Sequence, residues 1–429
     1  MSKGLKDTEL LSDVMGDKNY HQNQNRLSPV RNSYILFGSD IFMSRGGIAD
    51  YTDNFAKQLH SHGMLLKVIS PFAQKADRSY EVQNFKFSYF RKDSFLDKWW
   101  LTRKGVTLLH FVQQFYQSVT GLRRLVKDKE NTTIIFTEYY TKQFDIIIYC
   151  ARLLHIKYAI VFHGLDLIVG HLKEFGYFKN NIIDAHFVVF NSESTAKLCK
   201  TVLNLMPDRS IILYPGIDIE SIENNCLLDY KGRKFSNGED CLVFSTVSRL
   251  VPRKGIDIAV RIVHGLAQKN IKVRYYIGGV GSEMEALHYL IGELGAENYI
   301  HLMGELSDAE KYDLLRTSDF FLLPNHSAGN TDFEGFGISF IEASYFGNVV
   351  IGGKHGGVKE AVSDGATGFL FDFDDPDSIN KVQDAICSLL MQPDKIKYIK
   401  AKGTSFVAEK FDWNNLIQQF VQFEKEQLS

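Results

Sequence analysis

The chain has 429 residues, which is too long for one ordinary domain and indicates two or three. It is 45% hydrophobic and 23% charged, a globular composition that excludes a wholly disordered chain, a collagen and a coiled coil. The formal net charge is −2, so no basic excess indicates a nucleic-acid partner, and any anionic ligand must be held by a local site.

The sequence carries no signal for membrane insertion or for a metal cluster. No apolar run reaches the roughly 18 residues of a transmembrane helix, and the polar residues 1–30 lack the apolar core of a signal peptide. We expect this segment to be a flexible tail. The five cysteines form no CxxC pair, which argues against a metal or disulfide framework and favours the reducing cytoplasm.

Short apolar strands alternate with amphipathic helices twice along the chain. The first series of expected strands is 33–37, 65–70, 133–137, 158–162, 187–190 and 211–214. The second series is 242–247, 273–277, 300–303, 320–323 and 349–351, with helices at 256–268, 283–294, 309–317 and 338–346. Continuous apolar strands between helices are typical of parallel α/β sheets.

The repetition predicts two doubly wound domains, at 31–220 and 240–405. A polar segment at 221–239, rich in Asn and Gly, is expected to link them. A last helix in 406–429 is expected to pack back on the first domain. Ligands of open α/β sheets bind at the carboxyl ends of the strands, so the informative residues should directly follow strands.

The first such loop contains Gly46 and Gly47, between the first strand and an amphipathic helix. Glycines let the backbone approach a ligand, and a helix N-terminus offers free N–H groups to an anion. A tight strand–helix turn explains the pair equally well, and the GxGxxG dinucleotide fingerprint is absent here.

The second loop, 248–255, places three cations within six residues. Arg249 and Lys254 are five positions apart, so both can converge on one diphosphate beside the following helix. A solvated basic loop is the alternative, and we expect it to hold for Arg253, which should point outward.

The third loop is the most informative, with the sequence Phe-Glu-Gly-Phe-Gly-Ile-Ser-Phe-Ile-Glu-Ala at 333–343. Gly335 and Gly337 free backbone N–H groups for a phosphate at a helix start. Glu334 and Glu342 flank this cradle and can accept hydrogen bonds from hydroxyls. Glu342 lies in an apolar stretch, so it needs a partner unless it faces water.

Taken together and in this order, these residues resemble the retaining, GT-B-fold glycosyltransferases of family 4, the glycosyl transferases group 1. That family has an Arg-x4-Lys loop and a Glu-x7-Glu motif at this approximate distance. The match is continuous over about 240–375, and further matching pieces lie at 278–281, 301–305, 353–360 and 364–370. The first half matches in pattern at Gly46-Gly47 and at 162–166. The resemblance implies two Rossmann-like domains that face a cleft.

The resemblance also implies roles by position. Glu334 would contact the transferred sugar with His163 beside it, while Arg249 and Lys254 would neutralise the leaving diphosphate. Glu342 would bind the ribose hydroxyls, and main-chain groups near Gly304 and Glu305 would meet the base. The other implied donor contacts are Gly47, Gly279, Gly335, Phe336, Gly337 and Ile338. For His163, a helix-capping or turn role is the alternative.

The implied activity is hexosyl transfer from a UDP- or GDP-linked sugar to a glycan or lipid-linked acceptor, in cell-surface polysaccharide or glycolipid synthesis. Two cations and a helix N-terminus can stabilise the leaving diphosphate without a metal, and no Asp-x-Asp directly follows any of the expected strands, so we expect neither metal nor cofactor. A sugar-nucleotide epimerase of the same fold and a non-catalytic glycan- or nucleotide-binding homologue are the alternatives.

The acceptor side is marked only by the segment 97–129. It carries seven Lys and Arg against two Asp, with aromatic residues interleaved. Such a helix can lie on an anionic membrane, which would place the protein at the inner face of the membrane. A core-facing helix with a solvated basic side is the alternative, and it is slightly favoured.

Overall fold

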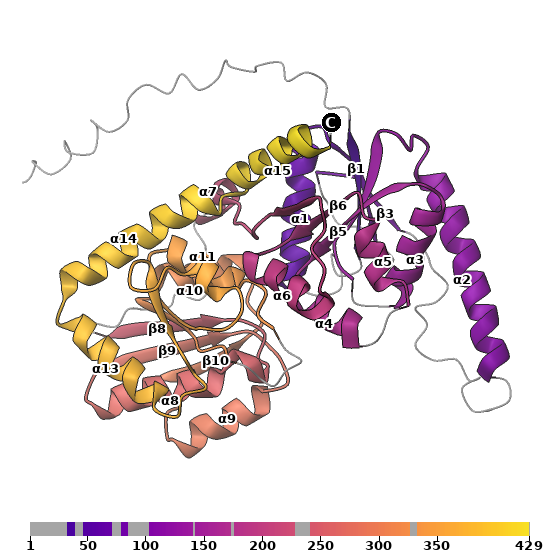
Figure 1. The fold of residues 1–429 in the computed structure, drawn as a ribbon. Coiled ribbons are helices and arrows are strands. Elements are labelled where there is room, and N and C mark those ends of the chain that lie inside the picture. The colour runs from indigo at the N-terminus through magenta and orange to yellow at the C-terminus, as the bar shows by residue number, and fades with distance from the viewer. Residues whose placement is uncertain are drawn as a thin grey trace, which may run out of the picture.

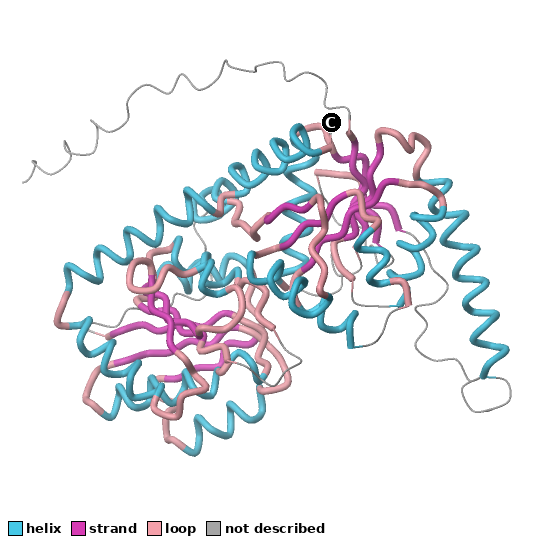
Figure 2. Tube along the Cα trace, viewed as in Figure 1, coloured by secondary structure: helices cyan, strands magenta, loops and turns pink. Residues whose placement is uncertain are grey.

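The computed structural model describes residues 32–38, 46–70, 79–84, 103–139, 142–172, 176–227, 241–326 and 333–428. They form two lobes, each built on one parallel sheet with helices packed on it (Figures 1 and 2). The predicted fold class, two doubly wound Rossmann-like units facing each other, is confirmed. The tail at 1–30 lies outside the described residues.

The first lobe has a seven-stranded sheet of order β3-β2-β1-β4-β5-β6-β7. Its strands are β1 Ser33–Phe37, β2 Leu65–Ser70, β3 Val82–Asn84, β4 Thr132–Phe136, β5 Lys157–Phe162, β6 Phe187–Phe190 and β7 Ser210–Ile212. Its helices are α1 Gly47–Ser61, α2 Arg103–Leu125, α3 Lys142–Leu153, α4 Leu165–Leu172, α5 Phe178–Ile183 and α6 Glu193–Leu203. Both faces of the sheet are apolar, so each carries its own buried cluster.

The second lobe has a six-stranded sheet of order β10-β9-β8-β11-β12-β13. Its strands are β8 Leu242–Val247, β9 Val273–Gly278, β10 Ile300–Gly304, β11 Phe320–Leu323, β12 Val349–Gly353 and β13 Gly368–Phe371. Its helices are α7 Ile219–Leu227, α8 Ile256–Gln268, α9 Met284–Glu293, α10 Asp308–Thr317, α11 Ile338–Tyr345, α12 Val358–Ala361, α13 Ser378–Leu390 and α14 Pro393–Lys410, with a 3₁₀ turn at Pro252–Lys254.

All eleven predicted strands are present, and within the described ranges β3 and β13 are the two strands that the sequence did not predict. Both lie at a sheet edge, β3 is three residues long and β13 begins with a glycine, so neither carries a continuous apolar signal. In each sheet the order reverses beside the first strand, since β1 lies between β2 and β4, and β8 between β9 and β11. Such a reversal opens a crevice at the carboxyl ends of the strands.

The chain crosses between the lobes twice, and the two crossings are hydrogen-bonded to each other. The N–H of Ile217 donates to the carbonyl of Phe411 at 2.8 Å, and the N–H of Trp413 donates to the carbonyl of Ile217 at 3.1 Å. The first part of the segment 221–239 is helical, because Ile222 of α7 is buried in the core of the second lobe. The rest of that segment lies outside the described residues.

The last helix, α15 Trp413–Gln427, continues from α14 and leaves the second lobe to cover the first (Figure 1). Its apolar residues recur at helical spacing, and they bury one face of the helix against α1. Trp413 is fully buried there, stacked on Phe55 at a ring-centroid distance of 6.1 Å and edge-on to Tyr51 at 5.4 Å.

Replacing Trp413 with alanine is therefore expected to lower the free energy of unfolding by about 3–5 kcal/mol, because the change leaves a cavity between α15 and α1. Urea denaturation followed by circular dichroism measures this loss. Tyr398→Ala, on the exposed face of α14, is the matched control and should change stability by less than about 0.5 kcal/mol. An equal loss in both variants would contradict the packing role of Trp413.

Candidate functional site

A cleft of about 480 Å³ lies between the lobes and is lined by loops that follow strands of both sheets. The first lobe contributes the start of α1, His163 after β5 and Asn191 after β6. The second lobe contributes the loops after β8, β9 and β10 and the start of α11. The predicted residues that line the cleft are Gly47, His163, Arg249, Lys254, Gly279, Glu305, Glu334, Gly335, Phe336, Gly337, Ile338 and Glu342.

Gly304 is the one predicted residue that does not line the cleft. It closes β10, and its carbonyl accepts a hydrogen bond of 2.7 Å from the N–H of Gly279. The next residue along the chain, Glu305, does reach the lining. Gly304 therefore lies behind the lining of the cleft and supports Gly279, which does line it.

Glu334 is buried at the floor of this cleft and is paired with two cations. Its Oε2 atom lies 2.5 Å from Nζ of Lys254, and the guanidinium of Arg253 donates to the same oxygen. Burial alone would raise the pKa of Glu334, but Lys254 and Arg253 outweigh it and lower the pKa to about 2. The carboxylate is therefore ionised at neutral pH.

The inward position of Arg253 corrects the prediction that this side chain points to solvent. The 3₁₀ turn at Pro252–Lys254 ends at Gly255, whose φ is +61°. A Cβ atom on Gly255 would lie 2.2 Å from the carbonyl oxygen of Pro324, so the turn presses directly on the end of β11. The N–H of His326 also donates to the carbonyl of Arg253 at 3.0 Å. These contacts orient Arg253 into the cleft, while Arg249 stays exposed.

The two lobes touch at backbone level beside Glu334. A Cβ atom on Gly335 would lie 2.1 Å from the carbonyl oxygen of His163, and one on Gly164 would lie 2.4 Å from the ring of Phe333. Gly164 has a φ of +103° as well. Glycine at these two positions therefore lets the loop after β5 lie directly against the loop before α11.

His163 is buried in the cleft wall and has a defined tautomer. Its Nε2 atom lies 2.9 Å from the carbonyl oxygen of Thr137, and its ring stands edge-on to Tyr51. Burial lowers the pKa of His163 to about 4, so the ring is neutral at pH 7. A carbonyl can only accept, so Nε2 carries the proton and Nδ1 is left as an acceptor.

The side chain that caps the turn after β5 is that of Asp166 and not that of His163. The buried carboxylate of Asp166 accepts backbone hydrogen bonds from His163 at 3.1 Å, from Gly164 at 2.9 Å and from Leu167 at 3.1 Å. Two of these donors precede α4 and the third lies in its first turn, so Asp166 holds the turn that leads into the helix. The His163 side chain is free of that task and lines the cleft.

A second charge cluster in the cleft contains a residue that the sequence analysis missed. Nζ of Lys311, on α10, lies 2.6 Å from Oε1 of Glu342 and 3.6 Å from Asp308. Glu342 is only 9% exposed, and Lys311 is the partner that a carboxylate in these apolar surroundings needs. Burial would lower the pKa of Lys311, but Glu342 and its other neighbours raise it instead, so it stays charged.

Asp50 reaches this second cluster from the first lobe. Desolvation in the cleft raises the pKa of Asp50 to about 6; Lys311 lowers it, whereas Glu342 and Asp308 add to the rise. The cleft thus holds one cationic group, at Arg249, Arg253 and Lys254, and a separate group in which carboxylates outnumber the lysine. A diphosphate suits the first group, and hydroxyls suit the second.

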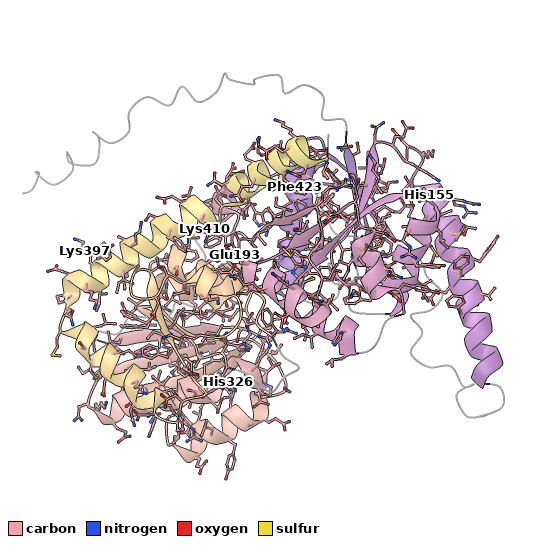
Figure 3. All side chains as sticks on the ribbon, in the orientation of Figure 1. His155, Glu193, His326, Lys397, Lys410 and Phe423 are labelled. Carbon is pink, nitrogen blue, oxygen red and sulfur yellow. The ribbon has the colours of Figure 1, made fainter. Side chains whose placement is uncertain are left out.

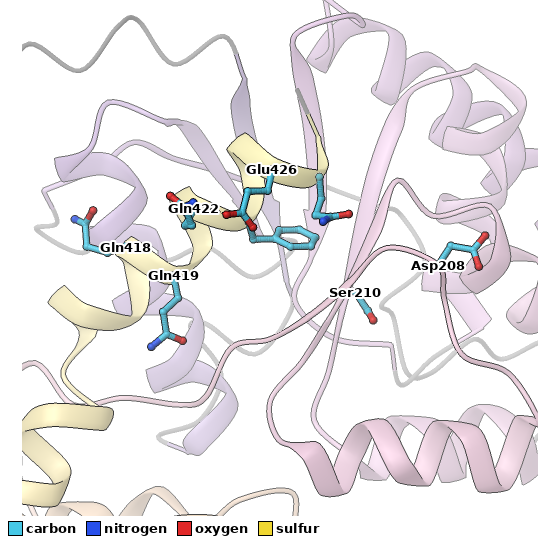
Figure 4. Close-up of a pocket in the computed structure, with 8 residues that line it drawn as sticks. Asp208, Ser210, Gln418, Gln419, Gln422 and Glu426 are labelled. Atoms are coloured by element: carbon cyan, nitrogen blue, oxygen red, sulfur yellow. Dashed lines mark hydrogen bonds between the residues drawn. The ribbon is translucent and has the colours of Figure 1, made fainter.

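A second, more open groove lies elsewhere, between α15 and the edge strand β7 (Figure 4). It measures about 780 Å³ and contains none of the predicted site residues. Its lining is Asp208, Ser210, Gln418, Gln419, Gln422, Phe423, Glu426 and Gln427. Because this lining has two carboxylates and no cation, it does not suit a diphosphate.

Comparison with known proteins gives a consistent family. The profile of a family described as "Glycosyl transferases group 1" matches residues 231–406, and that of "Glycosyltransferase Family 4" matches residues 45–221. The chain is 30% identical to a GDP-mannose-dependent alpha-(1-6)-phosphatidylinositol monomannoside mannosyltransferase of Mycobacterium tuberculosis over 213 residues. The matched residues make up 49% of this chain and 54% of that protein. The chain thus spans about half the length of this curated relative.

Other similarities extend over nearly the whole chain. An uncharacterized glycosyltransferase of Methanocaldococcus jannaschii is 23% identical over 89% of this chain and 95% of its own. The crystal structure of Anabaena HepE with UDP and glucose superposes with a TM-score of 0.65 at 18% identity, over 92% of this chain and all of that one. Staphylococcus aureus TarM superposes with a TM-score of 0.68 at 14% identity, over 91% of this chain and 98% of that one.

The environment of His163 generates a pH prediction. The histidine pKa falls from 6.5 in the unfolded chain to about 4 in the folded one, so the unfolded chain binds an extra proton between these values. Stability should therefore fall as the pH drops through this window, by about 2 kcal/mol at pH 5. His163→Gln can still donate to Thr137 and should lose this component.

Urea denaturation at pH 7.5 and pH 5 measures the difference for each variant. His155→Gln, at an exposed histidine labelled in Figure 3, should keep the pH dependence of the unchanged protein. A pH dependence that His163→Gln leaves intact would contradict the neutral, buried ring.

Proposed function

We propose that this chain, which belongs to the GT-B-fold glycosyltransferases of the glycosyl transferases group 1 family, is a hexosyltransferase. It would move a hexosyl group from a UDP- or GDP-linked sugar to a glycan or lipid-linked acceptor. The transfer would retain the anomeric configuration and need no metal ion. The observation that carries this proposal is the buried, ionised Glu334, held by Lys254 and Arg253 where the two lobes meet.

The charges of the cleft support an orientation for the donor. The diphosphate would lie against Arg249, Arg253 and Lys254 at the start of α11, where cations and free backbone N–H groups stabilise the charge that develops as it leaves. The nucleoside would extend toward Glu342 and Lys311. A reversed donor would put its phosphates among Asp50, Asp308 and Glu342, which would repel them.

The sugar would lie between Glu334 and His163. The Glu334 carboxylate only accepts hydrogen bonds, as does the Nδ1 atom of the neutral His163 ring, so both can orient sugar hydroxyls. With retention, the acceptor oxygen bonds to the anomeric carbon on the face from which the diphosphate departs. The bond between that carbon and the phosphate oxygen breaks, and the departing phosphate takes the acceptor's proton.

A lipid-linked acceptor is supported by α2 and by the name of the mycobacterial relative. Val112 and Tyr116 of α2 are 55% and 68% exposed, and Arg123 and Arg124 of the same helix are exposed as well. Leu122 is buried in one of the two apolar clusters of the first lobe. The helix thus has both a core face and an exposed apolar and basic face. The exposed apolar and basic face of α2 would lie on the inner face of an anionic membrane.

Two facts bound this membrane proposal. Among the described helices, none combines the length and apolar character needed to cross a bilayer. Residues 97–102, at the start of the predicted basic and aromatic segment, lie outside the described residues. The contact we propose is therefore peripheral and rests on the part of α2 from Phe111 onward.

A panel of UDP- and GDP-sugars with glycan and lipid-linked acceptors tests the transfer. Glu334→Gln and Lys254→Met should each lower kcat about 100- to 1,000-fold, because Lys254 would stabilise the leaving diphosphate while Glu334 would orient the sugar and hold Lys254 in place. Lys397→Met, on the exposed face of α14, should have no effect. Transfer should continue in EDTA, and the anomeric configuration of the product can be read by NMR.

The same assay separates the alternatives. Normal transfer by Glu334→Gln and Lys254→Met would overturn the site. Formation of an epimer from donor alone would favour the epimerase, and nucleotide binding without turnover of any donor would favour a binding protein. Loss of transfer in EDTA that Mg²⁺ restores would overturn metal independence.

Lys311 provides a separate test of the nucleoside position. If Lys311 orients Glu342 toward the ribose, Lys311→Met should weaken UDP or GDP binding about 10-fold, the loss expected for a charged hydrogen bond. With 2′,3′-dideoxy nucleotides the weakening should shrink below about 3-fold, since no hydroxyl remains for Glu342. Calorimetry measures both, with Lys397→Met as the control, and an equal loss for both nucleotides would contradict the role.

A further inference from the structure

The two lobes also meet outside the proposed donor contacts, at the N-terminus of α6. Glu360 lies on α12 of the second lobe, and its Oε2 and Oε1 atoms accept hydrogen bonds from the backbone N–H groups of Glu193 at 2.6 Å and Ser194 at 2.8 Å. The Ser194 hydroxyl donates back to the carbonyl of Gly356 at 3.2 Å. Figure 3 labels Glu193 where the lobes face each other.

These bonds complete a helix cap from the opposite lobe. The first N–H groups of a helix have no acceptor within it. In α6 the N-cap Ser192 satisfies only the N–H of Thr195, at 3.0 Å. Glu360 supplies an acceptor for two of the others, and its negative charge lies at the positive end of the helix dipole.

The turn that carries Glu360 is also attached to Glu334. The N–H of Gly357 donates to the carbonyl of Glu334 at 2.9 Å, and a Cβ atom on Gly356 would lie 2.1 Å from the same oxygen. On its other side, the 334–335 backbone presses on the carbonyl of His163. A single chain of contacts therefore runs from α6 through Glu360 and Glu334 to His163.

The crossing between the lobes joins the same contact. Burial and the nearby Glu360 carboxylate raise the pKa of Tyr214, which lies between the first crossing and the second lobe. The Tyr214 ring packs on Phe336, two residues after Glu334, at a centroid distance of 5.6 Å, and on Phe411 of the second crossing at 5.5 Å. A rotation of the lobes about the crossings would therefore disturb the packing of Tyr214 on the loop that carries Glu334.

We propose that Glu360 is a positioning residue, a latch that holds the two lobes closed and thereby keeps Glu334 opposite His163. The contact is suited to opening as well, because Glu193 is an exposed residue and water can replace the carboxylate at its N–H. Substrates must enter a cleft whose walls belong to different lobes, so the latch has to be reversible. The proposal goes beyond the donor site and depends on the proposed function only for its kinetic test.

Glu360→Ala and Glu360→Gln test the latch, with Glu285→Ala at an exposed carboxylate of α9 as the control. In Glu360→Ala, kcat should fall at least 10-fold while the Kd for UDP or GDP stays within 2-fold, because most of the proposed nucleotide contacts lie on the second lobe. The radius of gyration in small-angle scattering should rise. Glu360→Gln should be intermediate, since its amide oxygen keeps one acceptor.

Unchanged scattering together with an unchanged kcat per folded molecule in Glu360→Ala would overturn the proposal. An equal loss of nucleotide affinity and kcat would overturn it as well, by moving the residue's effect to the donor site. If the unchanged protein neither binds nucleotide nor transfers sugar, the proposed function fails. The scattering comparison and hydrogen exchange at Glu193 and Ser194 would then still decide the latch.

Discussion

The buried carboxylate of Glu334 is the constraint on which the rest of the cleft depends. An uncompensated charge at this depth costs several kcal/mol, so the position is tenable only with cations in direct contact. Lys254 and Arg253 meet this need, and they are held in place by a turn that presses on the end of β11. The glycines at 164 and 335 then allow the opposite lobe to close over the ion pair and keep it from bulk water.

The same rule shapes the other half of the cleft. Glu342 lies in the second turn of α11, and Lys311 of α10 pairs with it, so each carboxylate of the motif is paired with a cation from a different element. Helix α11 therefore has little freedom to shift without breaking one pair or the other. Because Phe336 lies between the two carboxylates and packs on the crossings, the position of this helix is also tied to the relative orientation of the lobes.

Sequence reasoning succeeded where local pattern decides and failed where tertiary contact decides. The continuous apolar strands and the order of the loops after them predicted both sheets and many of the residues that line the cleft. The direction of Arg253 depends on the contact between Gly255 and Pro324, which are far apart in sequence, so the local pattern misled. Lys311 lies on a predicted helix, and nothing in the local sequence distinguishes it from other helical lysines. The one indication was Glu342, whose apolar surroundings required a nearby lysine or arginine. Glu360 was visible as one letter of a matching segment, but its partner on α6 is 166 residues away.

The protonation states in the cleft bear on how a transfer could proceed. Neither cleft group that faces the sugar in our proposal is a good base at neutral pH, since the pKa of Glu334 is about 2 and that of His163 about 4. His163 also has its Nε2 proton committed to Thr137, and a protonated ring would bury an unpaired charge. A departing phosphate group, whose second pKa is about 6, is a better proton acceptor than either. In our proposal the acceptor hydroxyl therefore approaches on the diphosphate side, where its proton finds a better base than Glu334 or His163.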